Sequence, residues 1–233
     1  MSQNIDISSE ILYNLSDENA IGGDTLEERP RYTREVEERV NDFEPGSVFC
    51  AYDFLDIASA SAVNRALSRM ADKGLIRRVM QGIYDKPEYS EFLGEYSAPQ
   101  TDQVAHALAR KYNWTIAPAE DTALNMLHLS TQVPNQWIYV SDGPNRTYKY
   151  GNTVIHFRKR ANREISGRSY QTLLLIQALR AIGQGNIISE QVDRLKRMYT
   201  REEKKNILEE SKSVPAWIYE IIKQICKEDK VHA

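Results

Sequence analysis

The segment Ser59–Pro87, SASAVNRALSRMADKGLIRRVMQGIYDKP, constrains the fold of this chain more than any other. Its first half places apolar residues at helical spacing, so that they form one buried stripe of Val63, Ala66, Leu67, Met70 and Ala71. Gly74 follows where the end of a helix favours a positive φ. Two short strand candidates, Leu75–Met80 and Ile83–Lys86, flank a tight turn at Gln81-Gly82. This order predicts a winged helix-turn-helix, in which a recognition helix is followed by a two-stranded wing.

The face of the predicted helix opposite the apolar stripe carries short polar and cationic side chains, which suit base edges and phosphates in a major groove. Basic residues outnumber Asp72 and Asp85 between Ala60 and Lys86, although the whole chain has a net charge of -3. Such a local patch favours duplex binding through counterion release. The predicted DNA-binding residues are Ser61, Asn64, Arg65, Ser68, Arg69, Lys73, Arg77 and Arg78. A winged helix that binds only protein is the alternative.

The preceding residues complete a predicted DNA-binding domain over residues 31–90. Tyr32–Phe43 is expected to be its first helix, with Thr33 as N-cap. Ser47–Cys50 is expected to be a strand that pairs with the wing, and Ala51–Ala58 a second helix with Phe54, Leu55 and Ile57 inward. Ser59 or Ser61 is the expected cap of the recognition helix. Residues 1–30 are acidic and predict a flexible tail, which is either a solvated leader or a segment that competes with DNA or docks a partner.

Residues 100–233 predict an α+β domain that ends in helices, joined to the first domain by a linker at Lys86–Pro99. Expected strands are Thr115–Pro118, Gln136–Ser141, Arg146–Tyr150 and Asn152–Lys159. Expected helices are Thr101–Trp114, Asp121–Leu129, Tyr170–Ile182, Ser189–Tyr199 (capped by Ser189), Thr200–Glu210 and Pro215–Cys226. The predicted fold class of the whole chain is therefore α+β, with an N-terminal winged helix-turn-helix, a small mixed sheet and a helical C-terminal part.

A second basic surface is predicted on the small sheet and the loop that leaves it. Its cations are Arg146, Lys149, Arg158, Lys159, Arg160 and Arg163, interleaved with aromatic side chains. Cations mixed with aromatics grip nucleic acid, but they also fit an acidic protein partner. A solvated strand and loop that balance the acidic tail are the third interpretation.

No catalytic constellation stands out in the sequence. His106, His128, His156 and His232 are scattered, and none has a cysteine or carboxylate at metal-ligand spacing. We therefore expect no metal, no cofactor and no enzymatic activity. The two cysteines, Cys50 and Cys226, fit a reducing cytoplasm, and no apolar run has the length of a membrane span.

The chain resembles the AbiEi-type antitoxins of bacterial abortive-infection (type IV) toxin–antitoxin systems over about residues 33–165. The elements that carry the resemblance are KGLIRRVMQGIY and TALNMLHLSTQVPNQWIYVSDGPNRTYKYGNTVIHF. The resemblance implies a cytoplasmic phage-defence regulator whose winged domain binds inverted repeats in its own promoter, as a dimer or as two monomers on paired half-sites. It also implies a C-terminal domain that counteracts a nucleotidyltransferase toxin, for which we nominate the second basic surface. The rival hypothesis is an interaction module that binds an acidic protein without DNA.

Overall fold

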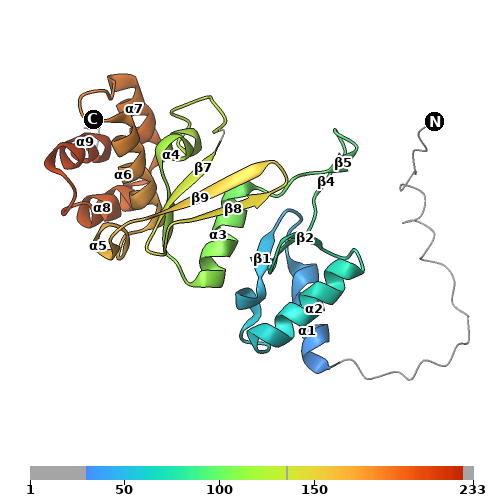
Figure 1. Ribbon diagram of the computed structural model, residues 1–233. Coiled ribbons are helices and arrows are strands. Elements are labelled where there is room, and N and C mark those ends of the chain that lie inside the picture. The colour runs from blue at the N-terminus through green and yellow to red at the C-terminus, as the bar shows by residue number, and fades with distance from the viewer. Residues whose placement is uncertain (1–29, 135, 228–233) are drawn as a thin grey trace, which may run out of the picture.

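The computed structural model describes residues 30–134 and 136–227. The predicted acidic tail, except for its last residue Pro30, and His232 therefore lie outside the described residues. Within these ranges, no helix is both long enough and apolar enough to cross a membrane. The chain is α+β, with helices and small sheets in both halves (Figure 1).

The N-terminal half has the element order of a winged helix. Its elements are α1 (Arg31–Asp42), β1 (Val48–Cys50), the 3-10 helix η2 (Ala51–Phe54), α2 (Ala60–Asp72), β2 (Arg77–Met80) and β3 (Ile83–Asp85). The strands form an antiparallel sheet in the order β1-β3-β2, so β1 pairs with the wing as predicted. Its core consists of the apolar stripe of α2 packed on Val36 and Val40 of α1 and on the ring cluster of Phe49 and Phe54.

Two local predictions in this half are wrong, and of the two caps expected for α2 one is confirmed. Thr33 is not the N-cap of α1, because the helix begins after Pro30 and the Thr33 side chain is buried one turn further in. The predicted helix over residues 51–58 is only the one-turn η2, and Leu55 is half exposed instead of inward. Ser59, rather than Ser61, caps α2, with its Oγ accepting a hydrogen bond from the Ala62 amide at 3.4 Å.

The segment expected to be a linker contains a second hairpin, formed by β4 (Tyr89–Ser90) and β5 (Glu95–Tyr96). Strands of two residues are too short to show a period in the sequence, so the turn-forming residues around them dominated the prediction. The hairpin projects from the wing beyond β2 and β3 (Figure 1).

The C-terminal half is built on a four-stranded sheet in the order β6-β7-β9-β8. Its strands are β6 (Ile116–Pro118), β7 (Trp137–Ser141), β8 (Arg146–Tyr150) and β9 (Thr153–Lys159). Only the β7–β9 pair is parallel, so the sheet is mixed, as predicted. The helices are α3 (Thr101–Tyr112), α4 (Glu120–Met126), α5 (Asn162–Ile165), α6 (Tyr170–Ile182), α7 (Ser189–Met198), α8 (Arg201–Glu210) and α9 (Ala216–Cys226).

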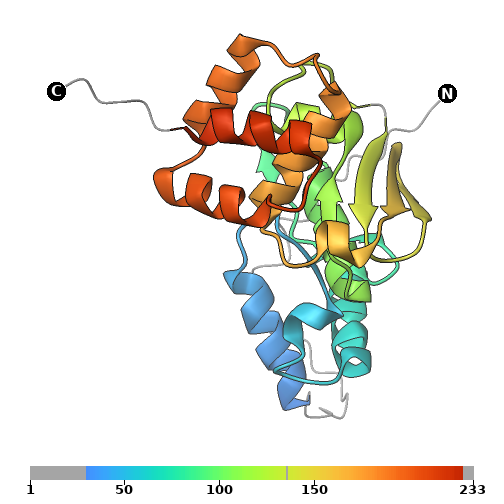
Figure 2. The ribbon, with the colours of Figure 1, turned by 90° about the vertical axis from the view of Figure 1, so that its left-hand side faces the viewer.

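Helices cover the two faces of this sheet unequally. One face packs on α3, and the other packs on α4 and α6 through Ile138, Val140 and Leu173. Helices α7, α8 and α9 add a further apolar layer on the outer side of α6 (Figure 2). In that layer Ile188, not Ser189, is the N-cap of α7, and its amide donates to Gln191 Oε1 at 3.2 Å.

One apolar core joins the two halves. Helix α3 buries Val104 and Leu108 against Ile83 of the wing on one side and Phe157 of the mixed sheet on the other. Arg110 of α3 also donates to the Val48 carbonyl at 3.0 Å. Because α3 packs on both sheets, it fixes how the wing lies relative to the mixed sheet.

Candidate nucleic-acid interface

Helix α2 separates a buried face from an exposed polar face. Its apolar residues Val63, Ala66, Leu67 and Met70 are at most 2% exposed, whereas Ser61, Asn64, Arg65 and Arg69 are exposed. Gly74, at a φ of 72°, ends the helix with a backbone conformation that other residues rarely adopt. The helix therefore presents the predicted polar residues together, as major-groove recognition requires.

The turn of the wing lies directly beside this face. Gly82, at a φ of 74°, forms the turn, and a Cβ there would lie 3.8 Å from Asn64 Oδ1. From the other side, Lys111 of α3 donates from Nζ to the Gln81 carbonyl at 2.6 Å. The structure thus brings Asn64, the wing turn and Lys111 together. Lys111 was missed at the sequence level, since only the packing of α3 places it here.

Arg78 of the wing joins the same surface. Its Nη2 donates to Ser68 Oγ at 2.6 Å, and its guanidinium lies over the Tyr84 ring at 5.6 Å. The side chain is still 45% exposed, and Asp72 lies 3.8 Å away. The ring and the hydroxyl hold Arg78 against α2, so its charge is preorganised at the junction between wing and helix.

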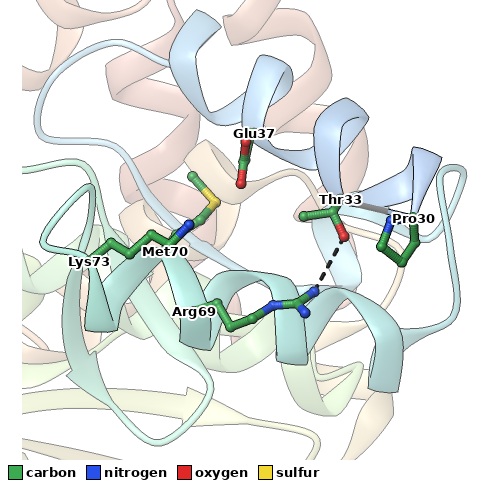
Figure 3. A pocket seen from close by; sticks show the side chains of 6 residues that line it. All are labelled: Pro30, Thr33, Glu37, Arg69, Met70 and Lys73. Atoms are coloured by element: carbon green, nitrogen blue, oxygen red, sulfur yellow. Dashed lines mark hydrogen bonds between the residues drawn. The ribbon is translucent and has the colours of Figure 1, made fainter. Parts of the chain in front are cut away.

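Arg69 and Arg65 lean toward α1. Arg69 Nη2 donates to Thr33 Oγ1 at 3.3 Å, across a small pocket that Pro30, Glu37, Met70 and Lys73 also line (Figure 3). The pKa of the Tyr32 hydroxyl lies below its ordinary value. Desolvation alone would raise this pKa, but hydrogen bonds with Arg65 and Thr33 and the positive charges of Arg65 and Arg69 lower it by more. Positive charge therefore extends from α2 onto the start of α1.

Arg77, which the sequence placed among the DNA-binding residues, is paired with a carboxylate of the wing. It donates from Nε to Asp85 Oδ1 at 3.0 Å and also pairs through Nη2 with Oδ2 of the same carboxylate. Nη2 donates further to the Ser97 carbonyl at 2.9 Å. Asp85 is buried, with a side chain that is only 1% exposed. Arg77 compensates this buried charge, so we leave it out of the interface.

The sheet register explains why Arg77 and Arg78 differ. Arg77 lies opposite Asp85 and Arg78 lies opposite Tyr84 on β3, so their side chains leave the strand on opposite faces. Lys86, a further cation of the wing, donates from Nζ to the Asn41 and Phe43 carbonyls at the end of α1. Two basic residues of this segment thus hold the fold together.

The six cations of the second basic surface do not form one face. In the β8–β9 register Arg146 lies on the α3 side of the sheet, whereas Lys149 and Arg158 lie on the opposite side. Arg158 pairs with Glu120. Lys159 ends β9 on the same side as Arg146, and the two remaining cations, Arg160 and Arg163, are exposed beyond it.

Arg146 is the member of this set that approaches the wing. Its guanidinium lies over the Tyr112 ring at 5.8 Å, and Lys111 Nζ lies over the same ring at 5.3 Å. Lys111 in turn contacts the wing turn. The exposed face of α2, the wing turn and the start of β8 are therefore linked through the C-terminal end of α3.

The comparisons with known proteins identify a family without a known activity. A family model described as "Family of unknown function (DUF6088)" matches residues 35–207. A search of curated proteins found no match. The matched range includes α2, the wing, the β4–β5 hairpin and the mixed sheet.

Proposed function

The chain belongs to the DUF6088 family of unknown function, and we propose that it is a sequence-specific DNA-binding transcriptional regulator. The observation that carries the proposal is the exposed polar face of α2, with Asn64 directly beside the wing turn. Winged helices read a major groove with this helix while the wing contacts the backbone. The regulator would act in the cytoplasm.

Different residues of the surface have different roles in this proposal. Asn64 and Arg65 would contact base edges, with Ser61 and Ser68 on the same helix, and Arg65 would exchange its hydrogen bond with Tyr32 for one with a base. Arg69, Lys73, Arg78 and Lys111 contact phosphates, which fixes the register of the helix on the duplex. Arg146 extends the phosphate contacts beyond the wing.

The resemblance to AbiEi-type antitoxins suggests which DNA and which partner to test. In this proposal the DNA is the chain's own promoter, the binding sites are inverted repeats that two copies occupy, and the partner is a nucleotidyltransferase toxin. The exposed side chains of Arg160 and Arg163, which follow the end of β9, support a second interpretation, in which the C-terminal half binds an acidic protein without DNA.

A mobility-shift titration against the upstream DNA at two salt concentrations tests the proposal. The Arg65→Ala variant should lose about 1–3 kcal/mol of binding free energy on the cognate duplex and much less on a scrambled duplex. Arg78→Met should weaken binding to both duplexes and reduce the salt slope by about one. Lys205→Ala, which removes an exposed charge on α8, is the matched control.

Three results would contradict the proposal. Equal losses from Arg65→Ala on both duplexes would refute the base-reading role. Unchanged affinity in all three variants would refute this surface. A folded protein without salt-sensitive duplex binding would favour the acidic-partner interpretation, which a pull-down with the toxin from a neighbouring gene then tests.

A further inference from the structure

The β4–β5 hairpin exposes an apolar patch at its tip. Phe92 is 96% exposed and Leu93 is 61% exposed, and Tyr89 and Tyr96 at the base of the tip are each more than half exposed. Single apolar residues on a surface need no explanation, but a contiguous group of large ones marks a contact site.

The hairpin that carries this patch is held in place. Tyr89 and Tyr96 pair across the strands with ring centroids 5.3 Å apart. Ser97 at its base donates from its amide to the Glu88 carbonyl and accepts from Arg77, which ties the base to the buried Asp85. The tip is therefore a preorganised contact element.

The charge around the tip indicates which surface it fits. Residues 87–99 contain Glu88, Glu91 and Glu95 but no lysine or arginine. Three carboxylates repel nucleic acid phosphates and anionic lipid headgroups. The tip therefore fits an apolar hollow on a protein, with arginine or lysine at the rim.

The chain itself carries such a hollow, of about 410 Å³, between α1, β1 and α3. Phe43, Val48 and Phe49 line it together with the polar Ser47 and Gln103 and the charged Arg39, Asp53 and Arg110, and Phe49 is only 1% exposed. Arg39 pairs with Asp56 through Nη1 and Nη2, and Arg110 pairs with Asp53 through Nε and Nη2. Nε of Arg39 and Nη1 of Arg110 take no part in these pairs, so each arginine retains a donor for a further carboxylate.

The hairpin and the hollow are neighbours on the molecule. A Cβ on Gly46 would lie 3.3 Å from Glu88 Oε2 at the base of the hairpin, and Ser47, the next residue, lines the hollow. Two copies related by a two-fold axis beside Gly46 can therefore exchange hairpins. Such a contact is isologous: both copies contribute the same surface, so the assembly stops at a dimer.

We propose that the chain forms a two-fold dimer in which the Phe92-Leu93 tip of each copy inserts into the hollow lined by Phe43, Val48 and Phe49 of the other. Glu91 and Glu95 would face Arg39 and Arg110. No residue of α2 lines the hollow, so both recognition helices stay free. This inference does not depend on DNA binding, and its failure would leave the proposed function standing.

Sedimentation velocity of the full chain over a concentration series tests the dimer. The double variant Phe92→Ser/Leu93→Ser should weaken self-association at least about tenfold, as expected for an aromatic anchor. Both side chains are exposed in the monomer, so the thermal midpoint of the dilute protein should not change. Val133→Ser removes an apolar side chain that is 79% exposed elsewhere and should leave the dimer intact.

Cysteine cross-linking locates the contact. Under mild oxidation, a Phe92→Cys copy mixed with a Ser47→Cys copy should form a disulfide-linked heterodimer, because the native Cys50 and Cys226 are buried. Loss of self-association in the serine variant together with this cross-link would support the proposal. A monomer at every concentration, a dimer that the serine variant leaves intact, or cross-links only between two Phe92→Cys copies would overturn it.

Discussion

Replacing Arg77 with Met should destabilise the protein strongly, while the same replacement of its neighbour Arg78 should change stability little. The two arginines are adjacent on β2 but have opposite environments. Arg77 neutralises the buried carboxylate of Asp85, whereas Arg78 lies on the exposed face against Ser68 and Tyr84. Methionine keeps much of the apolar length of the side chain and removes only the guanidinium.

The size of the stability loss follows from the Asp85 carboxylate, which stays buried when the Arg77 guanidinium is removed. Removing one partner of a buried ion pair costs roughly 3–5 kcal/mol, because the other charge stays buried and uncompensated. The Arg77 side chain is 34% exposed, so water can approach Asp85 from that side and the lower end applies. We expect a loss of about 3 kcal/mol, or a thermal midpoint lower by roughly 6–12 °C. The exposed Arg78 should contribute about 0–1 kcal/mol.

Urea denaturation of both variants measures the difference, and a double variant tests its cause. Asp85→Asn combined with Arg77→Met removes both charges, so it should be more stable than Arg77→Met alone. In the mobility-shift assay, Arg78→Met should reduce the salt slope and a folded Arg77→Met should not. Equal stability of the two single variants would refute the assignment, as would a double variant less stable than Arg77→Met.

Three further predictions concern other parts of the molecule. Burial raises the pKa of the Cys50 and Cys226 thiols to about 11 each, so alkylation near neutral pH should require denaturant; rapid labelling of the native protein would contradict this. Burial lowers the pKa of His106 below its ordinary value of 6.5, so the unfolded chain binds a proton more readily and the free energy of unfolding should fall as the pH drops below about 6.5. His106→Gln should flatten that part of the pH profile in urea titrations, and an unchanged profile would exclude His106 as its source. Gly143→Ala should cost roughly 1–3 kcal/mol, since a Cβ there would overlap the Trp114 ring, and calorimetry would show an unchanged midpoint if the ring can move aside.

Features with a long local signal could be predicted from the sequence. Helix α6 spans Tyr170–Ile182, as its apolar run indicated, and in the structure Ser169 Oγ caps it by accepting from the Thr172 amide. The capping box of Thr200 and Glu203 likewise marked the start of α8. These signals lie within one turn of the residues that they position, so tertiary contacts did not override them.

Features that depend on contacts between distant residues were missed. Nothing local indicates that Lys111 reaches the wing turn or that Arg146 lies over Tyr112, because both contacts require α3 to pack between the two sheets. The separation of Arg77 from Arg78 was within reach of the sequence, however. Consecutive strand residues point to opposite faces, so two adjacent arginines in a strand cannot both face one duplex.

The number of basic residues in a segment therefore overstates the positive charge that the segment presents to a ligand. Of the basic residues that suggested DNA binding, Arg77 pairs with a buried carboxylate that neutralises its charge, and Lys86 is turned toward two carbonyls at the end of α1. Lys111 comes into the surface from a helix that the segment does not contain. What defines the proposed interface is thus the set of cations that the fold places around α2 and the wing turn, without those that pair with a buried acid. That set is known only once the buried acids have been located.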